Sequence, residues 1–235
     1  MAPRHPNLPQ HRPLAIAHRA GNDIRFAQRA FDLGCDMVET DVWRYRKRIE
    51  LRHLKTMGPI PLLWDRWTLR PGWTSRLHLR DLLEALPTDK LIFLDLKGKD
   101  THLAHAIVDD IRKHQPERQI VLCGRTWAQL DEVVDHPHVT VFYSVGSDEE
   151  LATIWSRLER MEWPAVSIHS RYLTEDLMRR FKELNTTVVT WAVNTYEHAH
   201  RLHQIGVDGF TSDNLDMLAH IAEEREDALT KGPRT

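Results

Sequence analysis

Residues 90–124 read KLIFLDLKGKDTHLAHAIVDDIRKHQPERQIVLCG, two apolar runs with a helix-like stretch between them. The runs Lys90–Lys97 and Gln119–Gly124 are apolar on successive residues, which is typical of strands buried on both faces of a parallel sheet. Between them, His102–Lys113 carries apolar residues at three- and four-residue spacing, as an amphipathic helix does. The stretch therefore predicts a strand, a helix and a second, parallel strand.

The same alternation continues in both directions along the chain. Further strands are expected at Pro13–Arg19, Met37–Trp43, Val139–Val145, Ala165–Ser170, Val188–Asn194 and Gly209–Asp213. Further helices are expected at Ala27–Leu33, Trp127–Val134, Glu149–Arg160, Thr174–Leu184 and Tyr196–Ile205. This pattern predicts an α/β fold, a (β/α)8 TIM barrel. Because no Gly/Ser-rich linker divides the chain, we expect residues 1–235 to form one barrel domain with terminal tails at 1–12 and about 223–235.

One segment interrupts the alternation. Ile49–His53 is strand-like, but only Arg44–Arg48 separates it from the strand that ends at Trp43. A parallel crossover needs about a dozen residues or more, so this short connection predicts an antiparallel β-hairpin after the second strand. The hairpin would return His53 to the C-terminal mouth of the barrel, where barrel enzymes carry their active sites.

Composition excludes several classes of function. The 235 residues contain 32 Lys+Arg and 34 Asp+Glu, a formal net charge of −2, which disfavours nucleic-acid binding. The N-terminal residues lack the apolar stretch of a secretory signal, and no apolar run is long enough to cross a bilayer, so we expect a cytoplasmic protein with no transmembrane segment. Cys35 and Cys123 lack metal-ligand spacing and are expected to be buried thiols.

Carboxylates lie at the C-terminal ends of two expected strands. Glu39 and Asp41 are two residues apart and therefore share one face of their strand, and Asp95 ends another strand. Three converging carboxylates repel one another unless a cation compensates them, and oxygen ligands favour Mg²⁺ or Ca²⁺. The alternative is that Glu39 and Asp41 form ion pairs with the basic residues of Arg44–Arg48.

Two histidines are expected at the same mouth. His18 ends the first strand and His53 arrives through the hairpin. Most histidines in proteins are ordinary surface or core residues, but two beside a metal ion suit acid-base catalysis. One can take a proton from a nucleophilic hydroxyl while the other protonates the leaving oxygen.

Together these residues form a recognisable series. Its pieces are Ala17-His18-Arg19, Val38-Glu39-Thr40-Asp41-Val42, Leu51-Arg52-His53, Leu94-Asp95-Leu96-Lys97, Thr190-Trp191-Ala192-Val193-Asn194 and Gly206-Val207-Asp208-Gly209-Phe210-Thr211-Ser212-Asp213. In order and spacing the series resembles the glycerophosphodiester phosphodiesterase family, from His18 to about Leu218.

The resemblance implies a metal-dependent phosphodiesterase that converts glycerophosphodiesters to an alcohol and glycerol phosphate, through a cyclic phosphate. The implied site residues are the metal ligands Glu39, Asp41 and Asp95, the acid-base pair His18 and His53, and the substrate-binding residues Arg19, Lys97 and Trp191. The implied cofactor is a divalent cation, Mg²⁺ or Ca²⁺, and the implied partner is a small-molecule or lipid-derived phosphodiester.

The chain departs from the family pattern at three places. Asn22–Arg25 replaces a Pro-Glu-Asn-Thr-like stretch, Leu54 follows His53 where aspartate is common, and Asp95 stands where glutamate is frequent. The Asp95-Leu96-Lys97 run is also similar to the sphingomyelinase D enzymes. This leaves two alternatives: a phospholipase D acting on lysophospholipids or sphingolipids, and a non-catalytic barrel that binds phosphodiesters.

Tryptophans gather between His53 and Asp95. Trp64, Trp67 and Trp73 lie there with several leucines. They are expected to form a small satellite core over the barrel. The second choice is a lip that makes peripheral membrane contact. His169, Ser170 and Arg171 end another strand, where a rim hydrogen bond is expected ahead of a substrate contact.

Overall fold

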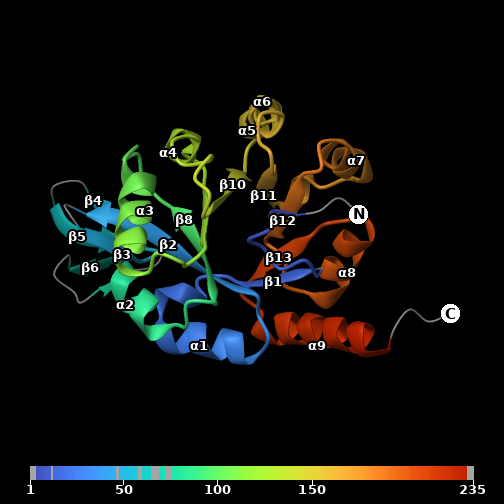
Figure 1. Cartoon of the computed structure of the whole chain (residues 1–235), viewed down its shortest axis with the longest axis horizontal. Coiled ribbons are helices and arrows are strands. Elements are labelled where there is room, and N and C mark those ends of the chain that lie inside the picture. Colours follow the sequence, from blue (N-terminus) through green and yellow to red (C-terminus); the bar gives the residue numbers. More distant parts are fainter. Residues whose placement is uncertain are drawn as a thin grey trace.

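The chain forms a closed barrel of parallel strands surrounded by helices (Figure 1). A computed structural model describes residues 4–11, 13–45, 48–57, 60–64, 69–71 and 76–231. The barrel strands are β1 (Leu14–Ala17), β2 (Met37–Tyr45), β8 (Leu91–Leu96), β9 (Ile120–Gly124), β10 (Val139–Val145), β11 (Ala165–His169), β12 (Thr187–Trp191) and β13 (Gly209–Ser212). They are hydrogen-bonded in the order β1-β13-β12-β11-β10-β9-β8-β2, and parallel pairing of β1 with β2 closes the ring. The expected fold class is confirmed.

Helices lie between the strands in sequence and on the outside of the barrel (Figure 1). They are α1 (Ile24–Asp32), α3 (Leu103–His114), α4 (Trp127–Asp131), α5 (Asp148–Thr153), α6 (Trp155–Leu158), α7 (Glu175–Glu183), α8 (Tyr196–Gln204) and α9 (Leu215–Lys231). The single helix expected at Glu149–Arg160 is wrong in one respect, because it is divided at Ile154 into α5 and α6. Side chains cap several helices, such as Asp23, which accepts a hydrogen bond from the Phe26 amide and begins α1.

The expected hairpin is present. Strand β3 (Arg48–Leu51) pairs antiparallel with the end of β2, with Val42 opposite Leu51, so the chain turns back toward the barrel before His53. The sequence did not predict the small antiparallel sheet of β4 (Lys55–Met57), β5 (Ile60–Trp64) and β6 (Leu69–Pro71), nor β7 (Leu77–His78) and α2 (Leu79–Ala85) after it. Trp64 is 40% exposed in this sheet, whereas Trp67 and Trp73 lie outside the described residues.

The barrel interior changes character along its axis. Every second residue of a strand points inward. On β2 and β8 the lower inward positions are Met37, Leu91 and Phe93, which pack in one apolar cluster at the barrel centre. Continuing the same alternation toward the C-terminal ends gives Glu39, Asp41 and Asp95. The apolar layers therefore form a floor, and the carboxylates lie above it at the mouth.

Both expected tails are partly built into the domain. Arg4 is 3% exposed and donates hydrogen bonds to the carbonyl oxygens of Pro9, His11 and Asp208, and Leu8 joins the apolar cluster in the barrel. At the other end, α9 continues to Lys231, and Arg225 donates a hydrogen bond to the Pro13 carbonyl. Among the described residues, no helix combines the length and the apolar character that crossing a membrane requires.

Candidate active site

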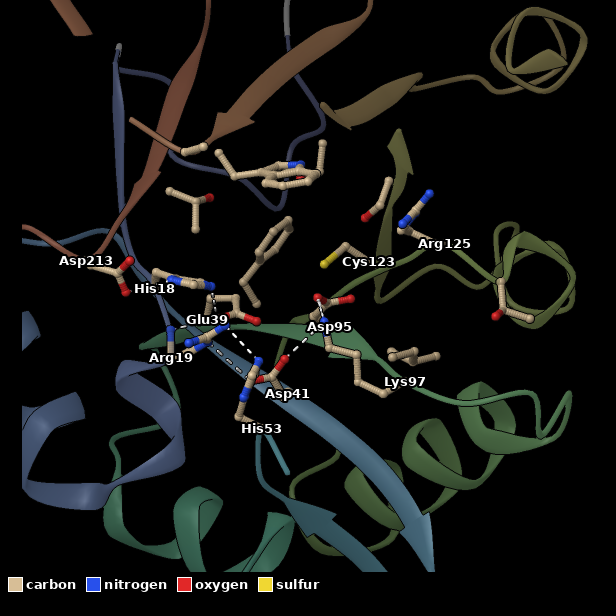
Figure 2. Close-up of a pocket in the computed structure, with 18 of the residues that line it drawn as sticks. His18, Arg19, Glu39, Asp41, His53, Asp95, Lys97, Cys123, Arg125 and Asp213 are labelled. Carbon is tan, nitrogen blue, oxygen red and sulfur yellow. Dashed lines mark hydrogen bonds and ion pairs between the residues drawn. The ribbon is translucent and has the colours of Figure 1, made fainter. Parts of the chain in front are cut away.

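A pocket of about 480 Å³ opens at the C-terminal ends of the barrel strands (Figure 2). All of the site residues expected from the sequence line it: His18, Arg19, Glu39, Asp41, His53, Asp95, Lys97 and Trp191. They come from five segments that are distant in sequence and end at one rim. The structure therefore brings the expected residues together, and Asn194, Asp213, Arg125 and Thr126 line the same walls.

Three carboxylates form the centre of the pocket, with Glu39 and Asp41 buried and Asp95 partly buried. Oxygen atoms of Glu39, Asp41 and Asp95 all lie within 4.8 Å of one another, although Asp95 has a shorter side chain than the glutamate common in similar sequences. Burial raises the pKa of Glu39 well above its usual range, and the neighbouring Asp41 and Asp95 raise it further. This pKa indicates that the protein alone does not fully compensate the charge of the cluster.

Lys97 supplies part of that compensation. Its ammonium nitrogen Nζ lies 3.0 Å from Oδ1 of Asp41 and donates a hydrogen bond to Asp95. Burial alone would raise the pKa of Asp41, but the charge and hydrogen bond of Lys97 outweigh burial and the pKa is lowered. The pKa of Asp95 stays raised, first through burial. The alternative to a metal site, ion pairs of Glu39 and Asp41 with the basic residues of Arg44–Arg48, does not appear among the described residues, where Arg44 pairs with Asp100.

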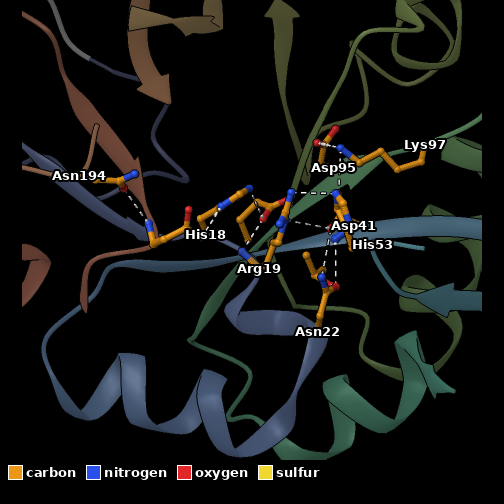
Figure 3. Close-up of polar contacts among 11 residues, drawn as sticks. His18, Arg19, Asn22, Asp41, His53, Asp95, Lys97 and Asn194 are labelled. Atoms are coloured by element: carbon orange, nitrogen blue, oxygen red, sulfur yellow. Dashed lines mark hydrogen bonds and ion pairs between the residues drawn. The ribbon is translucent and has the colours of Figure 1, made fainter. Parts of the chain in front are cut away.

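The loop after β1 holds two of the carboxylates from below (Figure 3). Arg19 has a left-handed backbone conformation, φ 54° and ψ 8°, and its amide donates a 2.7 Å hydrogen bond to Oε2 of Glu39. A short 3-10 helix, η1 (Ala20–Asn22), then brings Asn22 beneath β2. The Asn22 amide nitrogen donates to Oδ2 of Asp41, and its oxygen accepts from the Thr40 hydroxyl and the Asp41 backbone amide.

His18 is oriented by an acidic partner. Its Nδ1 lies 2.7 Å from Oδ1 of Asp213, and its Nε2 lies 4.0 Å from Oε2 of Glu39. A carboxylate only accepts hydrogen bonds, so Nδ1 carries the proton and Nε2 is directed toward the acidic cluster. Asp213 is itself held by its backbone amide, which donates to the side-chain oxygen of Asn194.

His53 meets a cation instead. Nη2 of Arg19 lies 2.7 Å from Nε2 of His53. A guanidinium only donates hydrogen bonds, so Nε2 accepts, and this imidazole is neutral with its proton on Nδ1. Arg19 also approaches Asp41, with 3.9 Å between Nε and Oδ2. The two histidines of the site therefore have opposite surroundings: His18 lies beside the carboxylate of Asp213, and His53 lies beside the guanidinium of Arg19.

Trp191 and Arg125 also line the pocket. The indole of Trp191 packs edge-on against His169, with 4.4 Å between ring centroids. His169 itself does not line the pocket; its Nδ1 accepts the Arg171 amide, the rim hydrogen bond that the sequence favoured. Cys123 is a buried free thiol beside Asp95 on the neighbouring strand, and Cys35 is likewise buried and free, as expected.

Comparison with known proteins agrees with this geometry. Residues 93–217 match the model of the glycerophosphoryl diester phosphodiesterase family, more than half of the chain. The chain belongs to this family. A glycerophosphodiester phosphodiesterase of Caldanaerobacter subterraneus subsp. tengcongensis is 22% identical over 90% of this chain and 98% of its own. Membership in the glycerophosphoryl diester phosphodiesterase family confirms the expected class of enzyme, a phosphoric diester hydrolase.

Solved structures share the fold. An Oleispira antarctica phosphodiesterase in complex with the product sn-glycerol-3-phosphate has a TM-score of 0.73 and 18% identity, covering 92% of this chain and 97% of that chain. The glycerophosphodiester phosphodiesterase of Thermotoga maritima has a TM-score of 0.70 and 16% identity, covering 89% and 99%. These similarities show that the barrel of this family member is the fold of other phosphodiesterases.

The acidic cluster fits a hard divalent cation. All of its donors are carboxylate oxygens, which Mg²⁺ and Ca²⁺ prefer, and such an ion would offset the charges of Asp41 and Asp95 that, after burial, raise the pKa of Glu39. Sequence patterns could identify Glu39, Asp41 and Asp95, because each is a charged residue within a buried strand. They gave no signal for Asn22, whose role depends on the conformation of the loop after Arg19.

Proposed function

We propose that this protein is a metal-dependent phosphodiesterase that cleaves glycerophosphodiesters to an alcohol and glycerol phosphate, with His18 and His53 as its acid and base. The observation that carries the proposal is the placement of both histidines in the same pocket as one cluster of three carboxylates, two of them buried. Glu39, Asp41 and Asp95 would hold Mg²⁺ or Ca²⁺. The ion would offset their charge and polarise a phosphoryl oxygen of the substrate.

The two imidazoles carry the proton transfers. One takes the proton from a glycerol hydroxyl next to the phosphate, whose oxygen then bonds to phosphorus. The bond from phosphorus to the alcohol breaks, and the other imidazole protonates the departing oxygen. The products are an alcohol and a cyclic phosphate, which water opens to glycerol phosphate. Asp213 supports this chemistry by fixing the His18 proton on Nδ1, which leaves Nε2 able to accept one.

Arg19 links substrate binding to the state of His53. Its guanidinium donates to Nε2 of His53 and lies 3.9 Å from Asp41, and its side chain is 43% exposed. An anionic phosphodiester competes for the same guanidinium, because Arg binds phosphate through charge-assisted hydrogen bonds. Transfer of Arg19 to the phosphate releases Nε2 of His53 for proton transfer. Lys97 supports binding by reducing the negative charge that the phosphate meets.

Phosphorus NMR tests this function. Purified protein with Mg²⁺ or Ca²⁺ is incubated with a panel of glycerophosphodiesters, and the spectrum separates diester, cyclic phosphate and monoester. We expect the diester signal to disappear with the wild type, and to persist with chelator or with His18→Ala or His53→Ala. Unchanged diester throughout the panel with the metal-loaded wild type would refute the proposed function.

One observation supports a second candidate, a phospholipase D acting on lysophospholipids or sphingolipids. Trp64 and Leu69 are neighbours across β5 and β6, and they are 40% and 63% exposed. An exposed indole beside an exposed leucine suits a lipid surface. This function predicts faster cleavage of micellar lysolipids than of water-soluble diesters, and loss of that preference in Trp64→Ala. Equal rates on both classes of substrate would contradict it.

A further inference from the structure

The pocket has a second side that the proposed chemistry does not use. His18 follows β1, the carboxylates lie on β2 and β8, and the ring then continues through β9 to β12. Arg125 comes directly after β9, and in Figure 2 it lies on the other side of the pocket from His18. Asp95 is paired with Cys123 in the register of β8 and β9, so Arg125 stands one strand away from Lys97. Adjacent strands are about 4.8 Å apart, so Arg125 is within reach of a diester bound at the carboxylates.

A single ion pair fixes the Arg125 side chain in place. Its Nε donates to Oε1 of Glu150 at 2.8 Å, and the other oxygen of Glu150 accepts the Gly146 amide at 2.7 Å. Both oxygens of Glu150 are therefore occupied, and its side chain is only 19% exposed, against 56% for Arg125. Among the residues that the structure describes, Nη1 and Nη2 of Arg125 donate to no protein acceptor. The guanidinium is held by one nitrogen and has two donors remaining.

Gly146 places this guanidinium beside an aromatic ring. A Cβ atom built on Gly146 would lie 3.3 Å from Cζ of Arg125 and 3.3 Å from Cζ2 of Trp191. Both side chains therefore lie next to the same glycine, and a larger residue there would crowd them. Glycine at this position lets the cation and the indole edge form adjoining parts of one wall.

We propose that Arg125 and Trp191 form a subsite for the leaving alcohol, and that Arg125 selects alcohols that carry a carboxylate. Among the described residues that line the pocket between β9 and β12, none has a carboxylate side chain, so an ammonium group there would face Arg125 without an acidic partner. This inference rests on the proposed function, since it names the class of diester that the same pocket prefers.

Charge, rather than the shape of the donors, favours a carboxylate over a phosphomonoester at this subsite. Nη1 and Nη2 are a pair of parallel donors, which match two oxygens of a carboxylate or of a phosphate. A phosphomonoester carries nearly twice the charge and would need a second cation. Arg171 does not supply it, because that side chain donates to the Gly146 carbonyl and to the Tyr172 hydroxyl and does not line the pocket.

Two substrates that differ by one carboxylate test the subsite: glycerophosphoserine and glycerophosphoethanolamine. We expect the kcat/KM of the wild type to be about tenfold higher for the serine diester than for the ethanolamine diester, which is the effect of one partly exposed charge-assisted hydrogen bond. In Arg125→Gln the ratio of the two kcat/KM values should fall close to one. Arg125→Lys, which keeps the charge but not the paired donors, should give an intermediate ratio. The matched control is Arg157→Gln, which removes an arginine–carboxylate pair with Asp131 outside the pocket and should keep the wild-type ratio.

The outcomes separate the two hypotheses. Cleavage of both diesters with the same ratio in wild type and Arg125→Gln overturns the subsite and leaves the proposed function standing. Absence of cleavage by the wild type overturns the function. In that case calorimetric binding of glycerophosphoserine still tests the subsite. Binding about tenfold weaker in Arg125→Gln supports it, and equal binding overturns it.

Discussion

Replacing Asn22 with alanine removes the support of a carboxylate without touching the carboxylate itself. The Asn22 side chain makes hydrogen bonds of 3.1 Å to Oδ2 of Asp41, 2.6 Å from the Thr40 hydroxyl and 3.2 Å from the Asp41 amide. At about 1 kcal/mol each, and with Asn22 half-buried so that water replaces part of the loss, the free energy of unfolding should fall by about 2 kcal/mol. Loss of a group that orients a ligand should also weaken divalent-ion binding by about 10- to 100-fold.

Two measurements report on these effects separately. Urea unfolding in the presence of chelator gives the stability change without metal, and calorimetric titration with Mg²⁺ gives the affinity. Asn7→Ala is the matched control, because the Asn7 side chain makes one 3.4 Å hydrogen bond, to the Pro137 carbonyl. It should change stability by no more than about 0.5 kcal/mol and leave Mg²⁺ affinity unaltered. Wild-type Mg²⁺ affinity in Asn22→Ala would refute the reasoning.

Three further perturbations have defined outcomes. Burial, then Asp41, raises the pKa of Glu39 above its ordinary 4.5, so the folded metal-free protein holds a proton that the unfolded chain releases. The free energy of unfolding should therefore fall as pH rises above about 4.5. Urea titrations with chelator measure this fall, and an equal pH dependence in the wild type and Glu39→Gln would contradict the assignment to Glu39. Asp213→Asn weakens the 2.7 Å contact that fixes the His18 proton. It should lower kcat about tenfold or more with little change in KM, and it should alter the pH–rate profile. A wild-type pH–rate profile would exclude this role of Asp213. Gly21→Ala places a Cβ 2.7 Å from Cβ of Thr40 and should cost about 1–3 kcal/mol of unfolding free energy in urea, and wild-type stability would show that η1 can move away at no cost.

Much of the fold could be predicted because its strands are buried on both faces. A strand such as Val139–Val145 is apolar or uncharged at every position, and it was found with its observed bounds. The hairpin could be predicted from the short spacing between Trp43 and Ile49, which excludes a parallel crossover. The acidic ligands Glu39 and Asp41 were visible because they interrupt the buried run of β2, where a charge has no structural reason to be buried.

The elements that escaped prediction depend on weak or distant signals. Helix α2 begins with a capping box of His78 and Asp81. Because histidine is not a usual N-cap residue, the sequence gave no recognisable start signal for this seven-residue helix. The charged segment after Ala222 was expected as a tail, yet Arg225 pairs with Asp36, a contact that spans most of the chain and leaves no local pattern. Arg125 is a single basic residue after a strand, and only its neighbours in space distinguish it.

Titration with Mn²⁺ followed by electron paramagnetic resonance tests the central claim most directly, because bound and free Mn²⁺ give different signals. The account predicts one ion bound per chain, displaced by excess Mg²⁺ and lost in Asp41→Asn, which removes the charge of a residue whose oxygens lie within 4.8 Å of the other ligand oxygens. Equal Mn²⁺ binding by the wild type and Asp41→Asn, or none by either, would contradict it.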